Sequence, residues 1–368
     1  MSDGRRISFV VGSGRSGTST MSGTLQALGM HVPQPEVAGN ATNPKGFGEP
    51  KWAVEFHERL LNRVRVQTGD ARPSAWFDTG RPAMREIFRN ELYEWLEEQF
   101  AAAEAGDEAA GELPTSELVV KDPRLVWFIG MWRGAAIRCR ATPSYITMLR
   151  PVTEVVGSKQ KYYAAGSRPG SQNEISRTAG WVNVMLHTEV ATRDSERAFV
   201  RYADLLDDWT VPVFELGERL QYDAVLRASA QDLRKVHSFI DPSLRRVHLT
   251  WDDLHVPARL REIAQATWSA LDRLADKDGD TPELRATLDQ LREDYTDYYT
   301  EAELLTQSTA ASARLEGIVA ERDRLAGLGG AGGADATGSR IPHSLRAMVP
   351  AGARRAVKQR LEARKTDG

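Results

Sequence analysis

Four short apolar runs, each ending in charged or small residues, are spread over the first two thirds of the chain. They are ISFVVG (7–12), ELVVKD (117–122), YITMLR (145–150) and RAFVRYADLL (197–206). Runs of this kind predict buried strands, the last one leading directly into a helix. Helical spacing predicts helices at 18–28, 51–66, 82–104, 127–132 and 153–165. Alternating strands and helices are typical of an α/β protein whose central parallel sheet is flanked by helices on both faces.

The first strand runs into a glycine-rich stretch, VVGSGRSGTSTM (10–21), and then into a helix. Gly12 and Gly17 have the spacing of a phosphate-binding P-loop, but Thr18 stands where a nucleotide kinase has its lysine. Backbone N–H groups ahead of a helix form an anion cradle whatever the side chains are. We therefore predict an anion site at Gly14, Arg15, Ser16, Gly17, Thr18 and Ser19.

The cation inside this loop is Arg15. An ATPase or kinase site is disfavoured, because the lysine that reaches the β- and γ-phosphates is missing. The second strand does end in Asp122, but Pro123 and Arg124 follow it, and a cationic neighbour is a poor companion for a magnesium ligand. A fixed guanidinium suits a transferred group with one negative charge rather than two, such as a sulfuryl group. Taken by itself, the loop is also compatible with a glycine-rich turn that binds nothing.

Composition limits the class of protein further. The 368 residues, 41% of them hydrophobic and 27% charged, indicate one large globular domain with an appendage. The single Cys139 excludes an internal disulfide and a multi-cysteine metal site, and the seven histidines form no zinc motif, so we predict no metal. The N-terminus enters a strand directly and no apolar run could span a bilayer, so we expect a cytoplasmic protein.

Charge is distributed unevenly along the chain. Residues 340–368 carry eight Lys and Arg against two acids, a net charge of +6, so the rest of the chain carries −9 of the total of −3. An acidic body argues against nucleic acid as a partner. The tail mixes arginines with apolar residues. Both a helix lying on the anionic inner face of a membrane and a solvated tail fit this pattern.

A coiled-coil-like seam of leucines and tyrosines, three and four positions apart, runs over 284–305. It is interrupted at Thr309 and Ser312 and resumes weakly beyond them. The seam could pair two chains into a homodimer or fold back as a hairpin. The resulting organisation is a main domain over 1–280, a helical coiled-coil-like segment over 281–326, a Gly-rich linker over 327–339 and a basic amphipathic tail over 340–368.

Three segments, in order, resemble the sulfotransferases that use 3′-phosphoadenosine 5′-phosphosulfate (PAPS). GSGRSGTS (12–19) is similar to their 5′-phosphosulfate loop, LVVKDPR (118–124) to a Lys-x-Pro strand end, and LRPVTEVVGSKQKYY (149–163) to their 3′-phosphate element. VRYADLLDDW (200–209) is a weaker match to a Tyr-x-Asp-Leu segment that closes the nucleotide site. The resemblance covers about residues 7 to 250 and is to bacterial enzymes of the glycan or natural-product type.

The resemblance implies a P-loop NTPase-like fold and metal-independent, in-line transfer of a sulfuryl group from PAPS, the co-substrate, to a hydroxyl. Arg15 stands where many members of the family have lysine. It keeps the charge and the donors but cannot donate a proton. Lys121, at the end of the second strand, is implied to be a second catalytic cation. The alternative for Lys121 is an ordinary strand-end lysine paired with Asp122.

The resemblance also implies which residues bind the 3′-phosphate and the adenine of the nucleotide. Arg150 and Ser158 are implied to hold the 3′-phosphate by charge-assisted hydrogen bonds. Tyr202 is implied to stack on the adenine or to order the site, and a buried core tyrosine is the alternative. The late Gly-x-x-Gly-x-x-Lys segment of the cytosolic small-molecule branch is missing, which leaves Arg245 or Arg246 as possible substitutes.

A base must take the proton of the attacking hydroxyl. Glu49, in NPKGFGEP, is our candidate, because a loop carboxylate near the cradle could accept it. The alternative is an acid that stabilises a helix N-terminus next to Pro50. Further candidates are two reserve bases, Glu36 and His57, and two acceptor-pocket residues, Trp52 and Asp78, whereas Trp127 and Trp132 are expected in the core.

The acceptor is expected to be a hydroxyl of a glycan, a lipid-linked sugar or glycolipid, or a natural product (secondary metabolite). Its pocket is expected from the loops at 33–50, 68–80 and 166–180. Two other functions remain open at this point. One is a P-loop kinase-like phosphotransferase that uses ATP, and the other is a non-catalytic scaffold with a degenerate loop.

Overall fold

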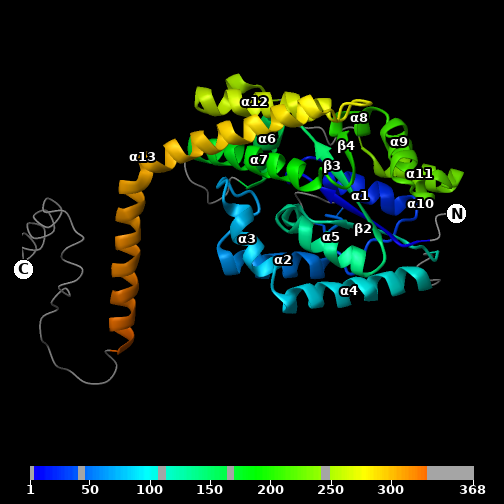
Figure 1. The fold of residues 1–368 in the computed structure, drawn as a ribbon, viewed down its shortest axis with the longest axis horizontal. Helices are drawn as coiled ribbons and strands as arrows, with labels where there is room; N and C mark the ends of the chain where they lie inside the picture. Colours follow the sequence, from blue (N-terminus) through cyan, green and yellow to red (C-terminus); the bar gives the residue numbers. More distant parts are fainter. Residues whose placement is uncertain (1–3, 40–45, 107–112, 164–169, 242–248, 330–368) are drawn as a thin grey trace, which may run out of the picture. The chain divides into compact units, whose positions relative to one another are not determined.

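The computed structural model describes residues 4–39, 46–106, 113–163, 170–241 and 249–329. Its centre is a four-stranded parallel sheet with the strand order β2-β1-β3-β4 (Figure 1). The strands are β1 (Arg6–Val11), β2 (Glu117–Lys121), β3 (Thr142–Leu149) and β4 (Glu196–Arg201). The predicted α/β class and parallel sheet are therefore confirmed.

The helices that surround this sheet are more numerous than the sequence predicted. They are α1 (Thr18–Ala27), α2 (Lys51–Val64), α3 (Ala75–Ala83), α4 (Glu86–Ala105), α5 (Ile129–Arg138), α6 (Val152–Tyr163), α7 (Gly170–Thr192), α8 (Tyr202–Asp207), α9 (Thr210–Leu220), α10 (Asp223–Leu226), α11 (Ala230–Phe239), α12 (Ala258–Arg273) and α13 (Pro282–Gly329), with 3-10 turns at Pro123–Phe128 and Trp251–Asp253. The predicted helix over 82–104 begins only at Glu86, because Arg85 is extended. The stretches 75–80 and 170–180, expected as parts of pocket loops, are helical in α3 and α7.

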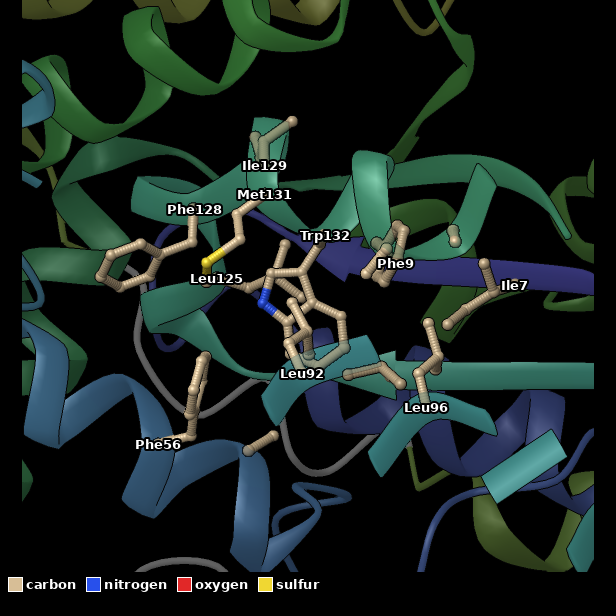
Figure 2. Close-up of a cluster of buried hydrophobic side chains, with 14 of the residues drawn as sticks. Ile7, Phe9, Phe56, Leu92, Leu96, Leu125, Phe128, Ile129, Met131 and Trp132 are labelled. Carbon is tan, nitrogen blue, oxygen red and sulfur yellow. The ribbon is translucent and has the colours of Figure 1, made fainter. Parts of the chain in front are cut away.

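Both faces of the sheet are buried, which is why its strands are continuous apolar runs. Side chains at alternate positions of β1 enter different cores. Ile7 and Phe9 pack against α2, α4 and α5, and the ring of Phe9 lies 5.6 Å from that of Trp132 in α5 (Figure 2). Val10 enters a second core, with Met21 of α1 and residues of α9.

The register of the strands brings their carboxyl ends together. Val10 lies opposite Lys121, and Leu149 lies opposite Arg201. The segment that follows β1 therefore begins beside the end of β2 and next to the residue that follows β3. In parallel sheets this edge is where ligands bind.

The first half of α13 belongs to the core of the main body. Leu284, Leu288, Leu291 and Tyr295 are buried in one cluster with residues of α6, α7 and α12. The hydroxyl of Tyr295 donates a hydrogen bond of 2.6 Å to the carbonyl oxygen of Ala71. The prediction of a dimer seam over 284–305 is wrong for these positions, because the chain covers them with its own helices.

The main compact unit extends to Leu304, past the predicted boundary at residue 280. A second unit begins at Leu305, where α13 continues without a break at Thr309 or Ser312 to Gly329. Its side chains are exposed from 305 to 324. The predicted tail over 340–368, nearly all of the linker, and Arg245 and Arg246 lie outside the described residues. Within the part of the chain that is described, no helix combines the length and apolar character needed to cross a bilayer.

Candidate active site

The glycine loop between β1 and α1 has the backbone of an anion cradle. Gly12 and Gly17 have positive φ angles of 121° and 89°, and Arg15 has a φ of 77°. A Cβ atom on Gly12 would lie 2.9 Å from the carbonyl oxygen of Met148, and one on Gly17 would lie 2.1 Å from the ring of Tyr202. Glycine is required at both positions by conformation and by space.

The loop also turns back on itself. The N–H of Ser16 donates to the carbonyl oxygen of Ser13 at 3.2 Å. The hydroxyl of Ser16 is buried and has no hydrogen-bond partner among the described residues. Buried hydroxyls are nearly always paired in folded proteins. This donor therefore fits a ligand that occupies the cradle.

The two predicted phosphate elements form one constellation. Arg15 donates through Nε to Oγ of Ser158 at 3.1 Å. Arg150, which follows β3, donates through Nη1 to the carbonyl oxygen of Arg15 at 3.0 Å and through Nε to Oε2 of Glu154 at 3.0 Å. The structure thus brings together three of the predicted residues from two segments of the sequence.

Tyr202 packs against the glycine loop and Arg150. It follows β4 as the first residue of α8 and is 5% exposed. Its ring packs against Gly17, and the guanidinium of Arg150 lies 5.1 Å from the ring centroid. Burial raises the pKa of its hydroxyl, and a hydrogen bond with Thr20 opposes that shift. Tyr202 is thus a buried core residue that contacts both the glycine loop and Arg150.

Lys121 and Glu49, the second predicted cation and the predicted base, are in direct contact. Nζ of Lys121 donates to Oε1 of Glu49 at 2.5 Å, to the carbonyl oxygen of Phe47 at 3.1 Å and to Oγ of Ser19 at 3.3 Å. Both side chains are buried, with Lys121 2% and Glu49 8% exposed. The lysine thereby connects the end of the glycine loop to the 46–50 loop. The alternative pairing of Lys121 with Asp122 is wrong.

Asp122 belongs to a separate, fully buried network. Its Oδ2 lies 2.7 Å from Nδ1 of His57, and its Oδ1 accepts from N and Nη1 of Arg124 at 3.0 and 2.9 Å. Nε2 of His57 in turn accepts from the indole N–H of Trp132 at 2.7 Å. Burial opposes ionisation of Asp122, but the hydrogen bond from His57 and the charge and hydrogen bonds of Arg124 outweigh it and hold the pKa of Asp122 below its ordinary value.

This network excludes His57 as a base. Both ring nitrogens are engaged, so Nδ1 must carry the proton that bonds Asp122, and Nε2 is occupied by Trp132. The imidazole is 0% exposed. The reserve assignment of His57 is therefore wrong, because no lone pair of the ring faces a substrate.

The other acceptor-side candidates lie in ordinary structural contacts. Trp52 stacks on Phe56 and Trp95, with ring centroids 4.8 and 4.4 Å away, so one side of this half-buried ring packs against the core. Oε1 of Glu36 accepts from Gln26 and Gln34, and Oδ2 of Asp78 accepts from Arg72. Trp127 and Trp132 are buried, as predicted.

Two cations near the loop were missed from the sequence. Lys159, one residue after Ser158, donates through Nζ to Oγ of Ser13 at 3.3 Å. Burial, followed by the charges of Arg177 and Arg15, lowers its pKa to about 8. Arg177 lies on α7, and burial lowers its pKa too. The sequence alone does not distinguish a helical lysine or arginine that lies near a site from one that points into solvent. Only the fold reveals this pair.

A large cavity, of about 1100 Å³, lies away from the loop, between β4, α9 and the segment that joins α12 to α13. Acids dominate its charged lining, among them Asp204, Asp207, Asp208, Glu215, Asp276 and Asp280. Such a lining repels an anionic nucleotide. Within the described residues, no group of three or more His, Cys, Asp or Glu side chains could hold a metal ion.

No protein-family model matches this chain, and no curated protein matches it. Two similar solved structures are the sulfotransferase domain of the Synechococcus PCC 7002 olefin synthase and the sulfotransferase domain from the curacin biosynthetic pathway. Their TM-scores are 0.40 and 0.38, each at 16% identity, covering 73% of this chain and 96% and 98% of those chains. Both are sulfotransferase domains, the family that the motifs of this sequence resemble.

Proposed function

We propose that this protein is a PAPS-dependent sulfotransferase that moves a sulfuryl group to a hydroxyl acceptor. The observation that carries the proposal is the contact of Arg15 with Ser158 and of Arg150 with the Arg15 carbonyl. These contacts join an anion cradle to a second, cationic anion site. A nucleotide with a phosphosulfate at one end and a separate ribose phosphate needs two such sites.

The residues of the loop fit the phosphosulfate end of this donor. Gly12 and Gly17 have the positive φ angles of a tight loop ahead of α1, and the backbone N–H groups at such a helix N-terminus would bind an anion. The buried hydroxyl of Ser16 lacks a partner among the described residues, and the loop amides with Arg15 would supply further donors. Arg150 and Ser158 would hold the 3′-phosphate.

Sulfuryl transfer breaks the bond between sulfur and an oxygen of the 5′-phosphate, forms a bond from sulfur to the acceptor oxygen, and releases the hydroxyl proton. Glu49 would take that proton. Its Oε1 accepts from Lys121, whereas Oε2 lies 3.9 Å from Nη1 of Arg124, so Oε2 is the oxygen that would receive it. Arg15, Lys121 and the loop amides would stabilise the negative charge that develops on the leaving phosphate oxygen.

The ATP-dependent alternative is less well supported by the residues. A P-loop kinase holds magnesium with an acid at the end of a neighbouring strand. The acid in that position, Asp122, has both carboxylate oxygens bonded to His57 and Arg124. The scaffold alternative predicts that changes of Arg15 leave the cellular role unaltered.

Nucleotide binding and turnover together test the proposal. Calorimetry should show that adenosine 3′,5′-bisphosphate binds in the presence of EDTA and that ATP does not. Radiolabelled PAPS, incubated with a panel of glycans, lipid-linked sugars and hydroxylated natural products, should then label an acceptor, and Arg15→Ala should abolish labelling. Tight binding of ATP that requires magnesium, without binding of the bisphosphate, would contradict the proposal.

A further inference from the structure

Two cations, Lys159 beside the glycine loop and Arg177 near Lys159, have no role in the scheme above. Lys159 of α6 contacts Ser13, at the start of the loop, whereas Lys121 contacts Ser19, past its end. The same Nζ atom of Lys159 lies 4.0 Å from the position that a Cβ on Gly69 would take. Lys159 thus lies between the glycine loop and the 67–72 loop, which overlaps the 68–80 segment expected to line the acceptor pocket.

Arg177 reaches the same region from α7. Gly180, one helical turn further on, packs so closely on the 67–72 loop that a Cβ there would lie 2.2 Å from the carbonyl oxygen of Gly69. Positions three apart share a helix face, so Arg177 is on the face of α7 that meets this loop. Its Nη1 is buried and has no hydrogen-bond partner within the described residues. Its charge and that of Lys159 act on each other.

Lys159 and Arg177 differ from two other cations near the loop, because those two are each paired with a carboxylate. Lys121 has the carboxylate of Glu49 at 2.5 Å, and Arg150 has that of Glu154 at 3.0 Å. For Lys159 and Arg177, no carboxylate of the described residues lies within 4.0 Å. Glu174, one turn before Arg177, attracts it at longer range but accepts a hydrogen bond of 2.6 Å from the backbone N–H of His255.

A partly buried pair of like charges without a counter-charge is unfavourable unless a ligand supplies the opposite sign. Building on the proposed sulfotransferase function, we infer that Lys159 and Arg177 bind an oxyanion of the acceptor. The acceptor class is then a hydroxylated molecule that also carries a carboxylate, phosphate or sulfate group. The donor's own anionic groups are assigned to the glycine loop and to Arg150 with Ser158, so this pair forms a separate subsite.

Inorganic sulfate, titrated at constant ionic strength into enzyme saturated with adenosine 3′,5′-bisphosphate, probes this subsite. Wild type should bind sulfate, and Lys159→Met and Arg177→Met should each weaken that binding about tenfold or more while leaving the bisphosphate affinity unchanged. Lys159→Arg should retain most of the affinity, and exposed Arg89→Met serves as the matched surface control. Unchanged urea midpoints would show that the variants fold.

The acceptor screen provides an independent readout. Matched pairs of acceptors that differ by one carboxylate, such as glucose and glucuronic acid, should show a lower KM for the acidic member, and Arg177→Met should remove that preference. The inference is overturned if both variants bind sulfate as wild type does, or if they weaken the bisphosphate instead. It is also overturned if Lys121→Met weakens sulfate binding and the other two variants do not. Sulfate would then occupy the site of the transferred sulfuryl group. If the bisphosphate fails to bind at all, the proposed function fails, but the sulfate titration of the free protein still tests the subsite.

Discussion

Two groups of buried or partly buried charged residues lie near the glycine loop, and they differ in whether each charge has an opposite charge beside it. On the side of β2, Lys121 is paired with Glu49, and Asp122 is paired with His57 and Arg124. On the side of α6 and α7, Lys159 and Arg177 lie near each other with no carboxylate of the described residues within 4.0 Å. The first group is complete as it stands, whereas the second needs an anion.

The difference separates residues that fix geometry from residues that await a ligand. A buried ion pair contributes little net stability, but removing one partner is strongly destabilising, so the paired group holds each side chain in one place. An unpaired cation keeps its full attraction for a ligand, because no internal acid has to be displaced first. Most of the variants below act on one group or the other.

The largest effect is expected at Glu49. Glu49→Gln keeps an oxygen near Lys121 but cannot accept a proton, so kcat should fall by roughly 10²- to 10⁴-fold. Affinity for adenosine 3′,5′-bisphosphate, measured by calorimetry, should stay the same. Glu36→Gln is the control, because that carboxylate is bonded by Gln26 and Gln34 and should leave kcat unaltered. Equal kcat values for the two variants would remove Glu49 from its role.

A His57 variant tests the part of the paired group to which we assign only a structural role, the network around Asp122. His57→Phe leaves Asp122 and the indole N–H of Trp132 buried without their partner, which should lower the free energy of unfolding by roughly 3 to 5 kcal/mol in urea titrations. The pH dependence of kcat should keep its shape in the folded variant, since this imidazole exchanges no proton with the substrate. If the variant loses one of the pH-dependent changes in kcat that wild type shows, His57 would be assigned as a base again.

Arg150, which is paired with Glu154 and donates to the carbonyl oxygen of Arg15, belongs to neither group and tests the assignment of the 3′-phosphate. Arg150→Ala removes a charged hydrogen-bond donor and should weaken the binding of adenosine 3′,5′-bisphosphate by roughly 10- to 150-fold. Arg89→Ala, on the exposed side of α4, should bind it as wild type does. If both variants bind the bisphosphate equally, the 3′-phosphate lies elsewhere.

The sequence predicted those parts of the site that follow from the ends of parallel strands. Lys121 and Arg150 come directly after buried apolar runs, so their meeting with the glycine loop follows from any parallel sheet of these strands. The contact of Lys121 with Glu49 was not predicted, because it depends on how the 46–50 loop packs on α1. Gly48 approaches Ser22 closely there.

Long-range packing accounts for what the sequence did not reveal. The heptad-like spacing of Leu284, Leu288 and Leu291 is that of any helix with one buried stripe, so it could not separate a partner chain from the body's own α7 and α12. In the same way, Lys159 and Arg177 are 18 positions apart on two helices. Their proximity depends on the packing of α7 against α6 and the 67–72 loop, which no local pattern encodes.

The smallest expected effect is the pH dependence of anion binding by the unpaired group. The groups that face Lys159 are Ser13, Arg15 and Arg177, and burial with the two positive charges lowers its pKa from 10.5 to about 8. The ammonium therefore loses its proton as the pH rises through about 8. The affinity for sulfate, whose own charge is constant in this range, should fall roughly tenfold from about pH 7 to about pH 9.

The free energy of unfolding, measured without an anion, should increase with pH, whereas the sulfate affinity decreases with pH. Between about pH 8 and pH 10.5 the unfolded chain holds a proton on Lys159 that the folded chain has released, so the free energy of unfolding rises with pH. Lys159→Met should flatten both slopes, while Lys51→Met on the exposed face of α2 should preserve them. A sulfate affinity that stays constant across this range in wild type would mean that Lys159 is not the group that holds the anion, and the contrast between the two sides of the loop would then rest on Arg177 alone.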